Sequence, residues 1–270
     1  MREINHSDSG GTYGYGRPRC GFTLIEMLVV IVVISLLMSI LLPVLNSARS
    51  SARKAVCISN LSQTGKAIHM YSMDYNGSIP LGPKAPPFLS PADFYPSTGT
   101  PTSLISLRDG RPVGLGLLLS RYLSTQSKVV FCPASDQSVS AEAELEKVGT
   151  SQSQCSYYYR HASTTRLFDS AADPAPIRVP LSSLGKNRNN RPVRALVMDT
   201  QFLCPESLAA FNVRPRTHHR LQIVNILFAE GHVSSSSNAD SRFTVDLTDF
   251  SEVRNAFSKI LAVLEEADEE

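Results

Sequence analysis

A carboxylate lies near the start of the most apolar stretch of the chain. Residues 22–42 carry one charged side chain, Glu26. If the chain were cut between Gly21 and Phe22, a new amine would stand four residues before Glu26, about one helical turn away. The amine and the carboxylate would then neutralise each other, within one chain or, more favourably, between neighbouring chains offset along their axes. The alternative is an acid at the end of the apolar run whose carboxylate reaches the water.

A second group of side chains with coordinating atoms lies towards the C-terminus. His218, His219, Glu230 and His232 are residue types that bind zinc. Their spacing matches no ligand signature, and a strand would point the two neighbouring histidines to opposite faces. A hairpin that turns at Gly231 needs no ion to hold it. We therefore predict a structural hairpin without a metal or cofactor, with a zinc site as the alternative.

The residues near the N-terminus require a long helix to position them. As a helix, residues 22–42 would span about 31 Å, which is enough to cross the apolar core of a bilayer. The run is longer than the apolar part of a secretory signal peptide. It is also apolar on all sides, unlike a surface helix of a soluble domain. The sequence predicts a transmembrane helix at 22–42.

Helical spacing continues beyond this span, through residues 43–76, and ends at Asn76-Gly77 before Pro80. We predict one helix of roughly 50 residues whose second half carries the rest of the chain. The residues at helical spacing form a stripe rich in small side chains, which allow close packing of helices; they are Leu45, Ala48, Ala52, Ala55, Val56, Ser59, Gln63, Ala67, Met70 and Tyr71.

Residues 77–270 predict a head of strands, short helices and long loops. The expected loop is 80–112, which is rich in Pro, Ser and Gly. Strands are expected at 129–132, 156–161, 194–199 and 221–228, with a return strand from 232 after a turn at 229–231. Helices are expected at 113–122 and 139–149 and at the C-terminus, where the last acidic residues form a solvated end. The predicted class is α+β, with an antiparallel sheet packed on the outer half of the long helix.

The stretch GFTLIE at 21–26, followed by the apolar run, resembles the class III prepilin signal of type IV pilins and type II secretion pseudopilins. The resemblance implies that a membrane prepilin peptidase cuts after Gly21 and methylates the amine of Phe22. It also implies that Glu26 helps to align subunits during assembly, and Pro43 stands where pilin helices commonly carry a proline. Residues 1–21 would then be a cytoplasmic leader peptide.

The same resemblance implies a structural function, in which the helices bundle in the core of a filament and the heads form its surface. The implied partners are other pilin or pseudopilin subunits, the prepilin peptidase/methyltransferase and an inner-membrane assembly platform. The implied location is the inner membrane, crossed once, with the head periplasmic or extracellular. The alternatives are a minor pseudopilin of a type II secretion system that contacts exported protein, and a membrane-anchored ligand-binding or enzymatic ectodomain.

Composition and motifs argue against two other classes of protein, nucleic-acid-binding proteins and enzymes. The chain has 26 basic and 24 acidic residues, a balance that gives no reason to expect nucleic-acid binding. The sequence has no nucleophile elbow and no phosphate-binding loop. We therefore expect a protein that is not an enzyme.

The stretch NILFAEGHV at 225–233 resembles the C-terminal signature of a prepilin-like family of planctomycete-type bacteria, in which a His precedes an Asn-x-Leu-Phe-Ala-Asp-Gly-His-Val hairpin. The Cys-Pro at 132–133 and a strand ending at Asp199 fit the same family. Two features depart from it: the acid is Glu230 rather than Asp, and ten residues separate His219 from it where the family has nine.

Four cysteines, at 57, 132, 155 and 204, lie outside the membrane in the implied topology, where the compartment is oxidising. They allow three sets of pairs, and the sequence does not choose among them. We take Cys132–Cys155 as the working disulfide, with free buried thiols as the alternative.

Some type II pseudopilins bind calcium through oxygen-rich loops, and residues 238–249 offer Asp240, Asp246 and Asp249. The same residues fit a solvated surface loop equally well. Calcium is therefore an alternative to the prediction of no cofactor.

Overall fold

The computed structural model describes residues 22–82, 101–137, 140–161, 178–211, 213–249, 252 and 255–270. The chain divides into two compact units, one ending at Ala48 and one running from Arg49 to Glu270. The predicted leader, Gly21 included, and residues 83–100 of the predicted loop lie outside the described residues.

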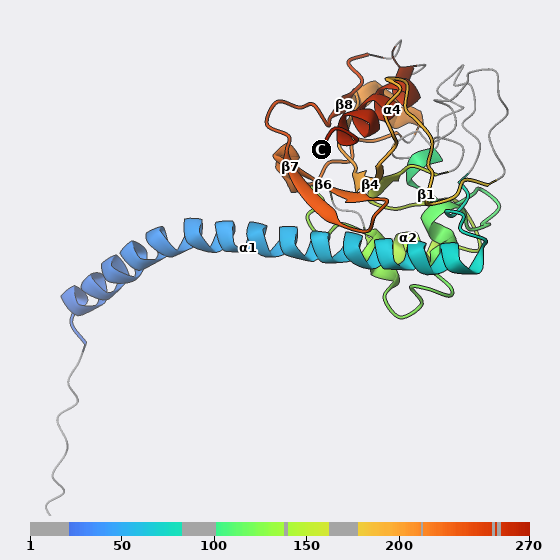
Figure 1. The fold of residues 1–270 in the computed structure, drawn as a ribbon. Coiled ribbons are helices and arrows are strands. Elements are labelled where there is room, and N and C mark those ends of the chain that lie inside the picture. The colour runs from blue at the N-terminus through green and yellow to red at the C-terminus, as the bar shows by residue number, and fades with distance from the viewer. Residues whose placement is uncertain are drawn as a thin grey trace, which may run out of the picture. The chain divides into compact units, whose positions relative to one another are not determined.

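The helix α1 runs from Leu24 to Asp74 and confirms the prediction of one long helix (Figure 1). It continues through Pro43. All side chains from 22 to 50 are exposed, and within the described part of the chain α1 is the one helix long and apolar enough to cross a membrane. A continuous apolar surface of this length needs lipid or other apolar helices around it.

The second half of α1 buries one narrow face in the head. The buried residues recur at spacings of three and four, as expected for one side of a helix; they are Cys57, Leu61, Thr64, Gly65, Ala67, Ile68, Tyr71 and Ser72. Most of the stripe at helical spacing does not belong to this buried face, because residues such as Ala52, Val56 and Met70 are exposed. Small side chains occur on every side of this segment, so the sequence pattern does not define the face that packs.

The central sheet has four antiparallel strands in the order β3-β4-β6-β7. Their bounds are Tyr157–Tyr159, Ala195–Asp199, Ile223–Phe228 and Val233–Ser237, which confirm four of the predicted strands. Two small pairs accompany this sheet. β1 (Leu104–Ser106) is antiparallel to β2 (Ser153–Gln154), and β5 (Phe202–Leu203) is parallel to β8 (Val245–Asp246).

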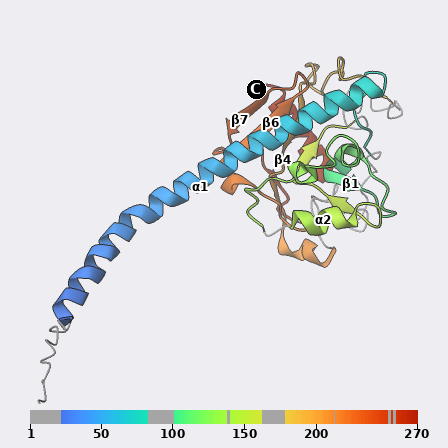
Figure 2. The ribbon, with the colours of Figure 1, turned by 90° about the horizontal axis from the view of Figure 1, so that it is seen from below.

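The two faces of the central sheet bury two different cores. Successive residues of a strand point to opposite faces, so Leu227 packs in the core that contains α1 and Phe228 in the core that contains α4 (Ala256–Ala267). Gly65 allows α1 to come close, because a Cβ there would stand 2.8 Å from Cδ1 of Leu227. The sheet is therefore a middle layer between the second half of α1 and the C-terminal helix (Figure 1). Seen from below, the second half of α1 lies across β4 and β6 (Figure 2).

Short helices replace part of the predicted pattern between the loop and the sheet. The predicted strand at 129–132 is wrong, because residues Ser127–Val130 form the 3-10 helix η4. A four-residue apolar run has no periodicity that separates a helix from a strand. The predicted helix at 113–122 is reduced to the 3-10 helix η3 (Gly114–Leu118). The helix predicted at 139–149 is confirmed as α2 (Ala141–Lys147), capped by the Ser140 hydroxyl. Three further 3-10 helices are η2 (Pro101–Ser103), η6 (Glu206–Phe211) and η7 (His219–Leu221).

The amphipathic C-terminal helix is confirmed as α4, but the prediction of a solvated acidic end is wrong for Glu265 and Asp268, which are buried. The side chain of Asp268 is fully buried against Arg160, whose Nη1 lies 2.7 and 2.8 Å from its two carboxylate oxygens. Glu265 is also buried and pairs with Arg188 at 2.8 Å. The remaining acids pair with arginines at the surface, Glu266 and Glu270 with Arg242, and Glu269 with Arg191.

We expect Gly231→Val to lower the free energy of unfolding of the head by about 1–3 kcal/mol. Gly231 has a φ of +93° in the turn between β6 and β7, a conformation that strains a β-branched residue. Gly231→Asn is the matched control, because asparagine tolerates positive φ better. Urea unfolding of the full-length protein in detergent measures both variants, and equal midpoints would show that the turn does not require this conformation.

Candidate functional site

The first turn of α1 is closed by a reciprocal cap. The backbone N–H and the hydroxyl of Thr23 both donate to Oε2 of Glu26, at 2.8 and 2.7 Å, and the Thr23 hydroxyl oxygen accepts the N–H of Glu26 at 3.2 Å. This is a capping box, in which an N-cap Thr and an acid three residues later satisfy each other's backbone donors. Glu26 therefore stabilises the start of α1 within a single chain, a local role that the sequence did not indicate.

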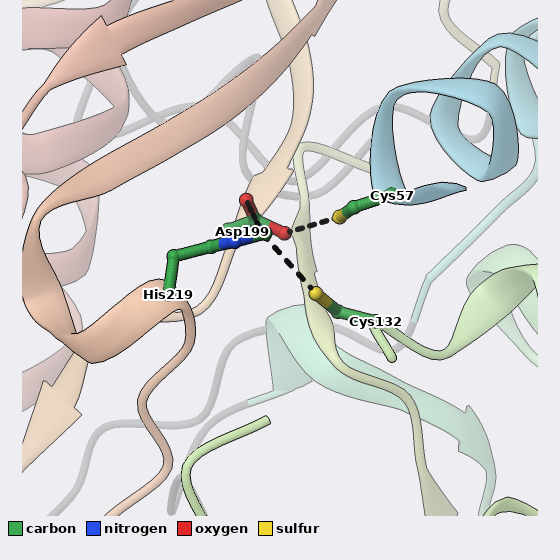
Figure 3. A group of neighbouring side chains, drawn as sticks. All are labelled: Cys57, Cys132, Asp199 and His219. Atoms are coloured by element: carbon green, nitrogen blue, oxygen red, sulfur yellow. Dashed lines mark hydrogen bonds and ion pairs between the residues drawn. The ribbon is translucent and has the colours of Figure 1, made fainter. Parts of the chain in front are cut away.

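Four buried side chains converge inside the head (Figure 3). Cys57 lies on α1, Cys132 follows η4, Asp199 ends β4 and His219 begins η7. One donor atom from each lies within 4.8 Å of all the others, and among the described residues this is the one such group of three or more Cys, His, Asp or Glu side chains. Cys57 Sγ is 3.2 Å from Asp199 Oδ1, and His219 Nε2 is 3.4 Å from Cys132 Sγ and 3.5 Å from Asp199 Oδ2.

The backbone that carries His219 into this group is strained. His219, Arg220 and Leu221 have φ values of +53°, +54° and +60°. Left-handed conformations cost non-glycine residues about 1–3 kcal/mol each and persist only where the surroundings fix them. Here the Asp136 carboxylate accepts the N–H of Arg220 at 3.0 Å and the hydroxyl of Thr217 at 2.8 Å. The turn is thus held in place from the segment that follows Cys132.

A second layer of polar groups orients the four side chains. Asn225 on β6 donates its backbone N–H and its Nδ2 to Oδ2 of Asp199, at 2.9 and 2.7 Å. Asn225 is itself held by the Ser235 hydroxyl, which donates to its Oδ1. The Tyr157 hydroxyl lies 3.7 Å from Cys57 Sγ. This arrangement occupies Oδ2 of Asp199 and leaves Oδ1 facing Cys57.

The close packing of these groups shifts their proton affinities. The pKa of Cys57 is raised by its hydrogen bond with Cys132, by burial and by the Asp199 carboxylate. Burial raises the pKa of Cys132, but its hydrogen bonds with Cys57 and His219 outweigh this effect and lower it. Burial lowers the pKa of His219, but its contacts with Cys132 and Asp199 outweigh this and raise it.

This cluster does not have the geometry of a nucleophilic relay. In a Cys-His-acid relay, one ring nitrogen of the histidine faces the nucleophile and the other nitrogen faces the acid. Here Cys132 and Asp199 both face Nε2 of His219. Several donor atoms that approach one point form a coordination site more naturally than a proton relay.

The structure separates the residues that the sequence offered as zinc ligands. Only His219 enters the cluster. The neighbouring His218 is buried elsewhere, with Nδ1 2.7 Å from the carbonyl oxygen of Thr200. Glu230 and His232 are exposed at the hairpin turn, 3.9 Å apart. The four sequence candidates do not form a common site.

The calcium candidates are also spread apart. Asp240 lies 3.8 Å from Arg242. Asp246 is exposed on β8, where its carbonyl oxygen accepts a hydrogen bond from Lys259. Within the described residues, the acids of 238–249 do not gather into a group close enough to share an ion.

The working disulfide Cys132–Cys155 is not formed in the structure, in which both thiols are free. The Cys155 thiol donates to two backbone carbonyl oxygens at 3.3 and 3.4 Å. Cys132 instead faces Cys57 and His219. The order of cysteines along the chain did not reveal that the helix supplies the nearest thiol.

Three members of the cluster, Cys57, Cys132 and Asp199, were not among the metal candidates from the sequence. Cys57 and Asp199 are 142 positions apart, and Cys132 and His219 are 87 apart. Ligand motifs are recognised by short spacings, so no motif joins these residues. The remaining signal was that Cys132, Asp199 and His219 each stand in a stretch that resembles the same prepilin-like family.

Comparison with known proteins gives a match at the N-terminus. A family model described as the prokaryotic N-terminal methylation motif matches residues 16–42. No curated protein and no solved structure matches the chain. The matched segment contains the Gly21–Phe22 bond, the capping box at Glu26 and the exposed apolar half of α1. The chain therefore carries the N-terminal prepilin signal of type IV pilins and type II secretion pseudopilins.

Proposed function

We propose that this protein is a structural filament subunit, a pilin or pseudopilin, that assembles through its N-terminal helix. The observation that carries the proposal is the prepilin signal at 16–42, which includes the start of a 51-residue helix. The first half of that helix is apolar and exposed, and its second half is built into an α+β head of pilin-like architecture. Such a helix can occupy lipid before assembly and a helical bundle afterwards.

The proposed sequence of events begins in the inner membrane, with the leader in the cytoplasm and the head on the other side. The prepilin peptidase cuts after Gly21 and methylates the Phe22 amine. The processed subunit then joins other pilin or pseudopilin subunits at an assembly platform. Glu26 pairs with the amine of a neighbour in the apolar core, where an isolated carboxylate would be costly.

A minor pseudopilin that contacts exported protein is the second candidate. It uses the same signal and the same helix, and it differs in abundance and in what the head touches. A membrane-anchored enzyme finds less support, because the buried Cys-His-Asp group presents one histidine nitrogen to both partners. We therefore propose a protein without catalytic activity.

N-terminal mass spectrometry of the protein from membranes of a host with prepilin peptidase tests the proposal. We expect the mature chain to begin at Phe22 and to carry one added methyl group on its amine. Gly21→Leu should block cleavage, because a large side chain at the cut bond does not fit a site for glycine. Gly14→Leu, outside the matched segment, is the control and should be processed normally. A mature chain that starts near Ala48, or an uncut wild-type leader, would contradict the proposal.

A further inference from the structure

We propose that Cys57, Cys132, Asp199 and His219 bind one structural zinc ion inside the head. The set supplies two thiolates, one imidazole and one carboxylate, which is a ligand combination that zinc accepts in four-coordinate sites. This proposal depends only on residues of the head, so it holds or fails independently of the proposed filament function. The zinc site considered from the sequence, at His218, His219, Glu230 and His232, is a different one and shares only His219 with this group.

The separations between the donor atoms agree with a tetrahedral ion. Ligands bound to zinc at about 2.0–2.3 Å stand about 3.3–3.8 Å from one another. Cys57 Sγ lies 3.2 Å from Asp199 Oδ1 and Cys132 Sγ lies 3.4 Å from His219 Nε2, and one donor atom from each of the four side chains lies within 4.8 Å of the others. An ion therefore fits between the four side chains after small movements.

The burial of an acid beside two thiols also favours a cation. Asp199 and Cys57 have no exposed surface, and buried charges are normally paired or bound to a metal. Zinc with two thiolates and one carboxylate leaves one net negative charge. The Asn225 amide and the Tyr157 hydroxyl face that charge from β6 and β3. On binding, both thiols lose their protons to solvent, and the ion replaces the hydrogen bond between Cys57 and Asp199.

The second layer is arranged as metal sites require. Ligating carboxylates are usually held by hydrogen bonds from the surrounding protein. Asn225 holds Oδ2 of Asp199, which leaves Oδ1 as the ligand atom that faces Cys57. The left-handed turn at 219–221 places the imidazole in the group, and a bound ion would offset part of its backbone strain.

The site is closed, which favours a structural role over a catalytic one. All four ligands are buried, and together they fill the four positions of a tetrahedral zinc ion, which leaves none for a substrate. An open cavity of about 810 Å³ reaches Cys132 and is lined beside it by Val56, Asn60 and Phe131, which gives an ion a path from the surface. The bound ion would join α1 to three segments of the head that are far apart in the sequence, and so restrict the unfolded chain.

Metal titration of the full-length protein, purified in detergent under reducing and metal-free conditions, tests the inference. We expect one Co²⁺ per chain, with the thiolate-to-cobalt charge-transfer absorption and the intense visible bands of a tetrahedral site. Zinc should displace the cobalt and abolish both signals. Removal of zinc with a chelator should lower the melting temperature, and added zinc should restore it.

Single substitutions show which side chains bind the metal ion. Loss of an orienting hydrogen bond near a metal weakens binding by about 10–100-fold, so loss of a ligand in Cys132→Ser or Asp199→Asn should weaken it more. Cys155→Ser is the matched control, because Cys155 is an equally buried thiol outside the cluster and should leave zinc affinity unchanged. The cobalt spectrum of the wild-type protein does not depend on any variant, so it still tests the proposal where a variant fails to fold.

Three results would overturn the inference. The first is a reduced wild-type protein that shows no thiolate-to-cobalt absorption. The second is zinc affinity that survives in both Cys132→Ser and Asp199→Asn. The third is a Cys57–Cys132 disulfide in protein isolated from cells without reductant, detected by peptide mass before and after reduction, because a disulfide removes two of the ligands.

Discussion

Asp268→Ala is expected to lower the free energy of unfolding of the head by about 3–5 kcal/mol, the usual cost of removing one partner of a buried ion pair. Asp268 and Arg160 are both fully buried, and Arg160 Nη1 contacts both carboxylate oxygens. Without the carboxylate, the guanidinium loses this counter-ion while it stays buried in the core.

The carboxylate of Asp268 also accepts hydrogen bonds from the backbone of the central sheet. Its Oδ1 accepts the N–H groups of Arg194 and Ala195, both at 2.9 Å, where β4 begins. Its Oδ2 accepts a hydrogen bond from the Asn187 side chain at 3.0 Å. Alanine would leave these buried donors without an acceptor, which adds to the loss. The end of α4 is therefore tied to the sheet by one side chain.

Urea unfolding of the full-length protein in detergent measures this effect, with Glu266→Ala as the matched control. Glu266 is an acid of the same helix end, but it pairs with Arg242 at the surface, at 3.4 Å, and its loss should cost about 0–1 kcal/mol. The double variant Arg160→Met with Asp268→Leu should recover part of the stability, because a buried pair can be replaced by apolar residues. Equal losses for Asp268→Ala and Glu266→Ala would mean that the pair does not stabilise the head.

Local signals in the sequence predict several elements of this fold, whereas features that depend on tertiary contacts leave no local signal. The bounds of α1 followed from an apolar run, helical spacing and the Asn76-Gly77 end, all of which act over a few residues. The strand β6 and its turn at Gly231 followed from an apolar run and a residue that tolerates positive φ. These elements are fixed by neighbours in the chain, so the sequence predicts them.

Features that depend on distant contacts were missed. The buried face of α1 contains Gly65, which allows the helix to approach Leu227, a contact that no pattern of small residues reveals. The acidic end looked solvated because Arg160, which buries Asp268, lies 108 positions earlier in the chain. The Cys57–Asp199 contact is missed for the same reason, since composition and spacing carry no information about side chains that meet only in the folded head.

We expect Glu26→Gln to abolish filament assembly while leaving the protein in the membrane. Glutamine keeps an oxygen that can accept the Thr23 N–H, so the capping box at the start of α1 survives. It has no charge to neutralise the Phe22 amine of a neighbouring subunit. An unpaired ammonium in an apolar helix bundle costs about 3–5 kcal/mol, which corresponds to a loss of about two to four orders of magnitude in the affinity between subunits.

Two further variants separate the cap from the charge. Thr23→Ala removes the capping hydroxyl, a loss of about 0.5–2 kcal/mol at the helix end, but it keeps the acid and should still form filaments. Glu26→Leu removes both the cap and the charge, and it should insert at least as well as wild type because leucine is favoured in lipid. It should then assemble as poorly as Glu26→Gln.

The measurement is the yield of sheared filaments relative to membrane-bound monomer, with processing at Phe22 checked by mass spectrometry in each variant. Normal filaments from both Glu26 variants would mean that the carboxylate serves only the start of α1. Loss of filaments in Thr23→Ala alone would assign the requirement to the helix cap rather than to the charge.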